Sequence, residues 1–198
     1  MLKKIIISIL SLVILSTGGL LLYNTFRHKP VYGIIVLDKD GTKVNDALNS
    51  QKKDIEKAVT VEGKWVEKSK MLVLNVTDAK KVMALNGFQK VTKSKNDYSF
   101  ESIKHISENE TTFFSKEESP LITDEANKAF PSMVHEYATL GESSAYVTSI
   151  FILPDTQYSE FTGSAVHLGV LKVKTDASKA LINYNKLEMC QLYNESRD

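Results

Sequence analysis

The residues best suited to acid–base or nucleophilic chemistry are His135, Glu136, Ser143 and His167. A zinc-binding helix carries two histidines four residues apart, but no second histidine follows His135-Glu136 at that spacing. A nucleophilic serine needs a strand before it and a helix after it, whereas Gly141–Ala145 is predicted to follow a helix and precede a strand. These four residues therefore form a catalytic site only if the fold assembles them from distant parts of the chain.

Metal and cofactor sites are not predicted. Asp38, Asp40 and Gly41 begin like a calcium loop, but such a loop needs glycine in sixth place and glutamate in twelfth. Lys43 and Asn49 occupy those two places. Scattered histidines and one cysteine give no metal-ligand spacing. We expect neither a metal nor a cofactor.

A set of aromatic residues provides the prediction for a contact surface. Loops carry much of the recognition in proteins, and exposed apolar side chains on them mark interaction sites. The aromatic residues in regions without a clear periodic pattern are Phe113, Phe114, Tyr158 and Phe161.

An uncharged stretch, Ile5–Tyr23, precedes a polar remainder. A membrane-spanning helix needs about 20 mostly apolar residues, which this segment just supplies. A cleaved signal peptide is the alternative, because Gly18-Gly19 could end a shorter apolar region, but Leu20–Leu22 continue the run. We predict a retained single-pass anchor that binds the membrane, with the N-terminus inside and residues 30–198 outside. Secretion after cleavage is the alternative outcome.

Lipid attachment is excluded at this segment. The stretch Leu15–Gly18 resembles the approach to a bacterial lipoprotein cleavage site, but Gly19 stands where the lipidated cysteine must be. A thioether cannot form without that thiol. The single cysteine, Cys190, cannot form an intramolecular disulfide either, so the outer part of the chain depends on its core.

The overall charge gives no reason to expect two further classes of partner. Four of the 25 basic residues and none of the 24 acidic ones precede Pro30, so residues 30–198 carry a net charge of −3. Nucleic-acid binding draws on clustered Lys and Arg, and so does electrostatic attachment to anionic lipid; the overall charge predicts neither. Only Arg27 and Arg197 are arginines, a bias typical of AT-rich bacterial genes.

The residues after Pro30 predict an α+β fold. Compact apolar runs indicate strands, and apolar residues at helical spacing indicate helices. The first half gives the order β-α-β-β-α-β, which is the ferredoxin-like arrangement. Its expected elements are strands at Val31–Leu37, Thr60–Val66 and Met71–Val76, helices at Asn45–Val59 and Ala79–Leu85, and a last strand at Phe88–Val91 or Asp97–Ile103.

The second half predicts a similar plan. A stripe of apolar residues between Thr123 and Gly141 has helical spacing, with a kink expected at Pro131. Its members are Ala126, Ala129, Phe130, Met133, Val134 and Tyr137. The other expected elements are a short strand at Thr111–Phe114, strands at Ala145–Leu153 and Val166–Val173, and a terminal helix at Asp176–Leu192.

A short repeat suggests two ferredoxin-like units in tandem. Thr77-Asp78-Ala79 and Thr175-Asp176-Ala177 each lead from an expected strand into an expected helix. This hypothesis divides the chain into an anchor at 1–29, a first α+β unit at 30–104, a connection at 105–122 and a second unit at 123–198. One domain over 30–198 is the alternative.

The absence of a coherent catalytic motif favours a membrane-anchored, extracytoplasmic binding or interaction protein of the cell envelope that is not an enzyme. Its partner would be a protein or a small molecule, which the sequence does not identify. The alternative is an envelope enzyme whose site is assembled from His135, Glu136, Ser143 and His167.

Overall fold

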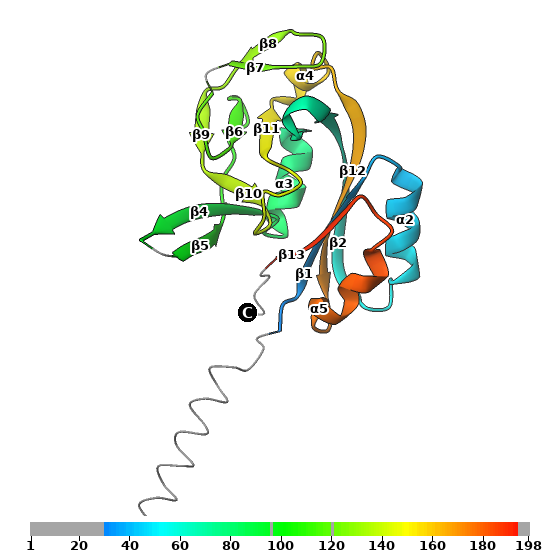
Figure 1. The fold of residues 1–198 in the computed structure, drawn as a ribbon. Coiled ribbons are helices and arrows are strands. Elements are labelled where there is room, and N and C mark those ends of the chain that lie inside the picture. The colour runs from blue at the N-terminus through cyan, green and yellow to red at the C-terminus, as the bar shows by residue number, and fades with distance from the viewer. Residues whose placement is uncertain (1–29, 96, 120, 194–198) are drawn as a thin grey trace, which may run out of the picture. The chain divides into compact units, whose positions relative to one another are not determined.

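The computed structural model describes residues 30–95, 97–119 and 121–193 (Figure 1). All the secondary structure described here lies within residues 31–193. In chain order the elements are β1 (Gly33–Asp38), α2 (Gly41–Ser50), β2 (Ile55–Val66), the 3₁₀ turn η1 (Glu67–Ser69), β3 (Met71–Asn75), α3 (Val76–Ala84), β4 (Phe88–Ser94), β5 (Asp97–Ser102), β6 (Thr112–Phe114), β7 (Leu121–Thr123), β8 (Ala129–Pro131), β9 (Val134–Glu136), β10 (Ala138–Leu140), β11 (Ser149–Leu153), α4 (Asp155–Tyr158), β12 (Ser164–Val173), α5 (Ala177–Ala180), the 3₁₀ turn η2 (Leu181–Tyr184) and β13 (Met189–Tyr193).

A mixed eight-stranded sheet forms the centre of the α+β fold, in the order β13-β1-β12-β2-β3-β11-β6-β9. The β3–β11 and β6–β9 pairs are parallel, and the other neighbours are antiparallel. Two small sheets, β10-β4-β5 and β7-β8, complete the described strands. Both β1 and β11 are buried at every position, so side chains from both faces of the central sheet lie in cores. That burial explains why these strands are continuous apolar runs in the sequence.

The two faces of the sheet are covered differently. One face packs against α3, β4 and β10, in a single core that includes Leu37, Leu74 and Val82. The other face has two separate covers. Helices α2 and α5 with η2 lie over β1 and β12, while the β7–β8 hairpin and the chain around Phe161 lie over β3, β6 and β11 (Figure 1). The second cover ends beside η1, where the face is open.

The ferredoxin-like pairing expected for the first half is wrong. In the structure β1 pairs with β12 and β13, which come from the far end of the chain. The helix expected at Asn45–Val59 is α2, which ends at Ser50, and residues from Ile55 onward belong to β2. The β-branched residues Ile55, Val59 and Val61 fit a long strand that pairs with β12 over ten positions.

The helix expected between Thr123 and Gly141 is absent. That stretch forms β8, β9 and β10 instead, and of the six residues in the stripe only Phe130 is buried. A helix gains most of its stability from burying its apolar face, and Pro131 would remove one of its hydrogen bonds. Strand pairing therefore prevails in this part of the chain.

The expected terminal helix is also wrong beyond its first turns. Only α5 and η2 are helical, and Met189–Tyr193 pairs with β1 as an edge strand. A Cβ added to Gly33 would come within 2.4 Å of the Tyr193 ring, so the ring packs directly over glycine backbone. A long-range pairing of this kind leaves no local pattern in the sequence.

The Thr-Asp-Ala repeats lie in different surroundings. The first follows β3, which has β2 antiparallel on one side and β11 parallel on the other. The second follows β12, whose neighbours β1 and β2 are both antiparallel. Strands from 30–104 and from 123–198 share one sheet, an arrangement that two tandem ferredoxin-like units would not have.

We predict that Tyr193→Phe lowers the free energy of unfolding by about 1–2 kcal/mol, since it removes a buried hydrogen bond. The Tyr193 hydroxyl donates to the Leu85 carbonyl at 2.7 Å and its side chain is fully buried. Urea unfolding of the full chain in detergent, followed by fluorescence of the single tryptophan, Trp65, measures the change. Tyr146→Phe is the matched control, because the Tyr146 hydroxyl donates to Glu188 at the surface, and we expect it to cost less than about 0.5 kcal/mol. Equal losses in the two variants would contradict the prediction.

Candidate functional site

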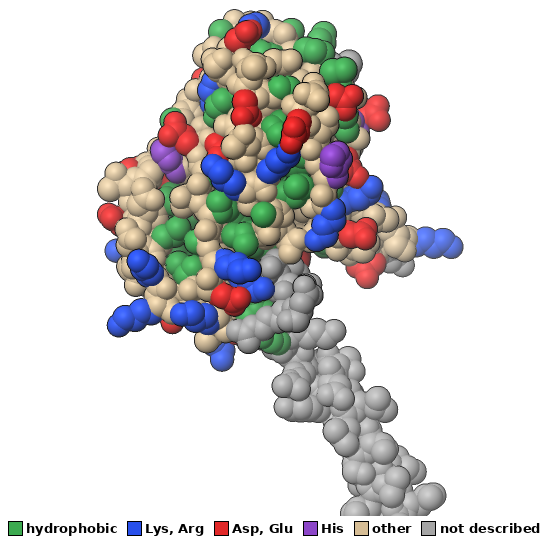
Figure 2. All heavy atoms as spheres, turned by 180° about the vertical axis from the view of Figure 1, so that it is seen from behind, with side chains coloured by type: hydrophobic (Ala, Val, Ile, Leu, Met, Phe, Trp, Pro, Cys, Tyr) green, Lys and Arg blue, Asp and Glu red, His purple; other side chains and the backbone are tan. Residues whose placement is uncertain are grey.

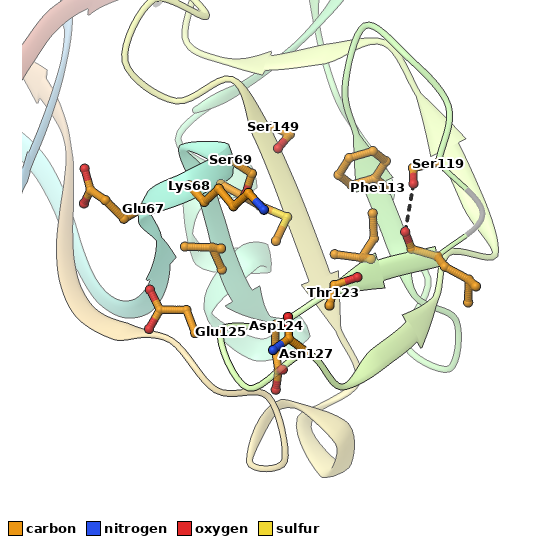
Figure 3. Close-up of a pocket in the computed structure, with 14 residues that line it drawn as sticks. Glu67, Lys68, Ser69, Phe113, Ser119, Thr123, Asp124, Glu125, Asn127 and Ser149 are labelled. Atoms are coloured by element: carbon orange, nitrogen blue, oxygen red, sulfur yellow. Dashed lines mark hydrogen bonds between the residues drawn. The ribbon is translucent and has the colours of Figure 1, made fainter.

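A groove with a volume of 820 Å³ lies where the β7–β8 hairpin meets η1 (Figure 3). Its floor is apolar and comes from three strands: Met71 opens β3, Phe113 lies in β6 and Ile122 lies in β7. These three side chains belong to the core beneath the hairpin, in which Phe113 contacts the Phe151 ring edge to face at a centroid distance of 6.2 Å. The groove is therefore an open continuation of this core.

The rim of the groove is polar. Lys68 and Ser69 lie on the η1 side, and Thr123, Glu125 and Asn127 lie on the hairpin side (Figure 3). An apolar floor with a few polar groups at its edge is typical of sites that bind small organic ligands or short chain segments.

Glu67 fixes the η1 side of the rim. It accepts hydrogen bonds from Lys39 Nζ at 2.9 Å and from Trp65 Nε1 at 2.8 Å. The hydrogen bond from Lys39, followed by that from Trp65, lowers the pKa of Glu67 below its ordinary value. The indole that donates this bond is itself buried and stacks on Tyr146, so η1 is tied to the main core.

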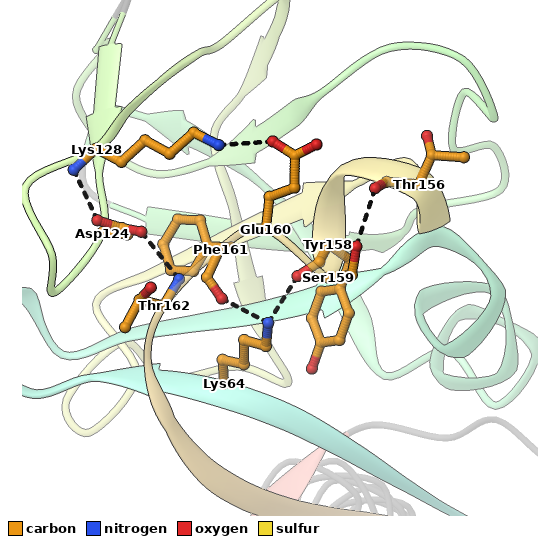
Figure 4. Close-up of polar contacts among 9 residues, drawn as sticks. All are labelled: Lys64, Asp124, Lys128, Thr156, Tyr158, Ser159, Glu160, Phe161 and Thr162. Carbon is orange, nitrogen blue, oxygen red and sulfur yellow. Dashed lines mark hydrogen bonds and ion pairs between the residues drawn. The ribbon is translucent and has the colours of Figure 1, made fainter.

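Asp124 fixes the hairpin side. Its buried carboxylate accepts hydrogen bonds from the backbone N–H groups of Lys128 at 2.8 Å and Thr162 at 2.9 Å (Figure 4). Burial acts to raise the pKa of Asp124, but these backbone donors outweigh burial and hold it below its ordinary value. Asn127 has a φ of 63° in the turn, a left-handed conformation that asparagine tolerates better than most residues.

Lys64 holds the segment that precedes Thr162, the residue to which Asp124 is hydrogen-bonded. The Lys64 ammonium donates to the carbonyl oxygens of Tyr158 at 2.6 Å and Phe161 at 2.5 Å, and lies 4.4 Å from the centre of the Tyr158 ring (Figure 4). Burial lowers its pKa. We call this set of groups the clasp, because together they attach the hairpin to β2. It consists of Lys64, Asp124, Thr162 and the carbonyl groups of Tyr158 and Phe161.

The lining residues have the chemistry of a binding site. Hydroxyl, carboxylate, amide and ammonium groups are present among the described lining residues, but histidine and cysteine are not. Throughout residues 30–95, 97–119 and 121–193, no three His, Cys, Asp or Glu side chains lie close enough together to hold a metal ion.

The four residues considered for catalysis are not brought together. His135 and Glu136 lie on the edge strand β9, where His135 Nε2 is 2.9 Å from the Ser115 carbonyl and Glu136 pairs with Lys90 at 2.5 Å. His167 lies in β12, and four other strands of the sheet separate β12 from β9.

Ser143 lies in the loop after β10, where its Oγ accepts a hydrogen bond from the Ala145 N–H at 3.2 Å. None of the four residues lines the groove. A site assembled from all four therefore has no support in this geometry.

The expected aromatic contact surface needs correction. Phe113, Phe114 and Phe161 are buried, and Tyr158 is half-buried. These regions are short strands and a helical turn packed on the sheet, so most of their rings point inward. Phe113 alone of the four borders the groove. The strands expected at Thr60–Val66 and Met71–Val76 leave Glu67–Lys70 between them as the connection that forms part of the rim, but the sequence gives no signal for the floor.

No helix among the described residues is long and apolar enough to span a membrane. The expected anchor, Ile5–Tyr23, lies outside those residues.

We predict that Asp124→Asn weakens the clasp and alters the acid sensitivity of the fold. Because the folded-state pKa of Asp124 is lowered, its carboxylate stabilises the fold above the ordinary pKa of about 4, and this contribution is lost as pH falls through the lowered value. The variant should lose about 1–3 kcal/mol at pH 7 and show a shallower fall in stability below about pH 4.

Urea unfolding of the full chain in detergent, repeated from pH 7 to pH 2.5, measures both effects. Glu160→Gln is the control, because Glu160 pairs with Lys128 at the surface and its loss should change little at pH 7. An Asp124→Asn variant with the acid profile of the unmodified chain would refute the role of the carboxylate.

Comparisons with known proteins agree with this fold. The chain is similar to the crystal structure of a Bacillus anthracis protein described as a lipoprotein, with 22% identity, a TM-score of 0.68, and coverage of 84% of this chain and 100% of the other. At that identity the likeness concerns the fold alone. The search of curated proteins gives no match. The model of a family described as an uncharacterised lipoprotein family matches residues 31–194, and this chain therefore belongs to the uncharacterised lipoprotein family.

Proposed function

We propose that this chain is a membrane-anchored, extracytoplasmic binding protein of the bacterial cell envelope, which takes its ligand in the groove and catalyses no reaction. The groove itself is the observation that carries the proposal: an apolar floor continuous with a core, a polar rim, and hydrogen-bonded attachment of both sides through Glu67 and Asp124. The ligand would be a small molecule or a protein segment with an apolar part. We also propose that residues 30–198 act as one domain, since their strands share one sheet.

Membership of a lipoprotein family supports attachment to a membrane outside the cytoplasm. A lipid anchor needs a cysteine, however, and Cys190 is the only one in the sequence. It lies in β13 opposite Val36, within the central sheet. We propose that the apolar segment Ile5–Tyr23 serves as an uncleaved anchor in place of the lipid, with the N-terminus inside.

Metabolic labelling with a fatty acid tests the anchor. The unmodified chain should take up no label, yet stay in the membrane fraction after alkaline carbonate extraction. A Gly19→Cys variant supplies the missing thiol and is the positive control. Label on the unmodified chain that disappears in Cys190→Ser would refute the proposal, as would release of the chain into the medium. Protease added to intact cells should digest residues 30–198, and full protection would place them inside.

Photo-crosslinking in intact cells tests the groove. A photoreactive amino acid in place of Lys68 should give a discrete adduct, and the same amino acid in place of Asn49, exposed on α2, should not. Thr123 is exposed and points into the groove (Figure 3), so Thr123→Trp should fill the groove and abolish the adduct. Identical adducts from positions 68 and 49, or adducts unaffected by Thr123→Trp, would rule out the groove as the binding site.

A further inference from the structure

Lysines gather at the end of the domain where the chain passes from Val31 into β1. Hydrogen bonds define this end: the Tyr32 carbonyl accepts from Val173 N–H at 2.8 Å, and the Val31 carbonyl accepts from Ala177 N–H at 2.7 Å. The end of β12 and the start of α5 therefore contact the first residues of the domain.

The turn between α2 and β2 lies at the same end. Lys174 N–H donates to the Asp54 carbonyl at 2.9 Å, and Lys174 Nζ donates to the Lys53 carbonyl at 2.6 Å. In the sheet Lys57 stands opposite Lys172. Asn183 of η2 donates to the Gln51 side chain at 3.0 Å, so η2 adjoins this turn as well.

We call this end of the domain the basic pole. Its lysines are Lys52, Lys53, Lys57, Lys172, Lys174 and Lys179, and its acidic residues are Asp54, Glu56 and Asp176. These six lysines and three acidic residues give the pole a net charge of +3. Residues 30–198 carry −3 as a whole, so the remainder of the domain carries −6. Figure 2 shows lysine side chains gathered at the lower end of the domain with few acidic ones between them.

One of the three acidic side chains of the pole is turned toward the local backbone. The Asp176 carboxylate accepts hydrogen bonds from Ser178 N–H at 3.1 Å and from Val31 N–H at 3.4 Å, so it caps local backbone. Lys52, Lys53, Lys57 and Lys179 are all exposed. Ile182, one of the most exposed large apolar side chains in the described structure, lies on η2 at the same end. Exposed lysines beside an exposed apolar residue are typical of surfaces that lie on a membrane.

We infer that the basic pole is a docking surface for the anionic phospholipid headgroups of the membrane in which the chain is anchored. The inference rests on the proposed anchor. Residues 24–30 separate the apolar segment from Val31, and seven residues reach about 25 Å at most. The pole is the part of the domain joined directly to this short tether, and an anionic surface attracts each nearby lysine with about 1 kcal/mol, or about a fivefold change in the docking equilibrium.

Fluorescence quenching on reconstituted full chain tests this surface. In a Cys190→Ser background, a fluorophore is attached to a cysteine introduced by Ile182→Cys, or, as the distant control, by Met133→Cys after β8. Both positions are well exposed, at 67% and 65%. The vesicles contain phosphatidylcholine with or without phosphatidylglycerol, and nitroxide-labelled headgroups act as the quencher.

We expect strong quenching at position 182 in vesicles with phosphatidylglycerol and little at position 133. Quenching at position 182 should decrease in pure phosphatidylcholine and at high salt, because exposed charges are screened within about 10 Å at 0.1 M salt. Equal quenching at both positions, or quenching independent of the anionic lipid, would overturn the inference.

Charge variants test whether docking depends on the lysines of the pole or on the net charge of the domain. Lys53→Gln, Lys57→Gln and Lys179→Gln together should weaken docking on the order of 100-fold and abolish the dependence on phosphatidylglycerol. The matched control replaces three exposed lysines elsewhere, Lys93, Lys95 and Lys116, and should leave docking unchanged. A control variant that loses as much as the pole variant would refute the assignment.

Flotation distinguishes failure of this inference from failure of the proposed anchor. Chain that floats with phosphatidylcholine vesicles but shows no difference between positions 182 and 133 keeps the anchor and overturns the docking surface. Chain that floats only with phosphatidylglycerol vesicles keeps the docking surface and overturns the anchor.

Discussion

The fold depends on a sheet that must be covered on both faces. Every residue of β1 and β11 is buried, and successive side chains along a strand point to opposite faces, so neither face can remain open to water over these strands. One face is covered by one continuous layer that includes α3. The other has two covers of different kinds, helices over β1 and β12 and a short hairpin over β3, β6 and β11. The groove exists because the hairpin is smaller than the apolar face beneath it.

A cover made of two three-residue strands needs more than apolar contact to stay in place. The β7–β8 hairpin contributes few buried side chains, chiefly Ile122 and Phe130, and an isolated hairpin of this size is marginally stable in water. The clasp adds hydrogen bonds that the short strands cannot make themselves. Asp124 joins the turn to Thr162, and Lys64 joins that segment to β2. Elements of this kind open at a lower free-energy cost than the core does, and ligand-binding loops commonly have such low local stability.

The sequence predicted the elements whose pattern is local. The apolar runs at Val31–Leu37, Met71–Val76 and Val166–Val173 correspond to β1, β3 and β12, and the capped segment at Ala79–Leu85 to α3. It failed where a long-range pairing decides the structure: Met189–Tyr193 is a strand because β1 accepts it as a neighbour, and the stretch around Phe130 forms strands because a sheet edge and Pro131 exclude a helix. The groove floor was unpredictable for the same reason, since Met71, Phe113 and Ile122 come together only through the strand order.

The net charge of the domain shows a second limit of prediction from the sequence. The sum of −3 over residues 30–198 argues against attraction to an anionic surface, but a sum contains no information about position. The β2–β12 pairing and the hydrogen bonds to Val31 and Tyr32 bring lysines separated by more than a hundred residues to the end where the chain enters β1. That placement follows from where β1 begins, whichever chemistry anchors the chain. Any anchor that residues before Pro30 supply would deliver the tether to Val31, and therefore to the same basic pole.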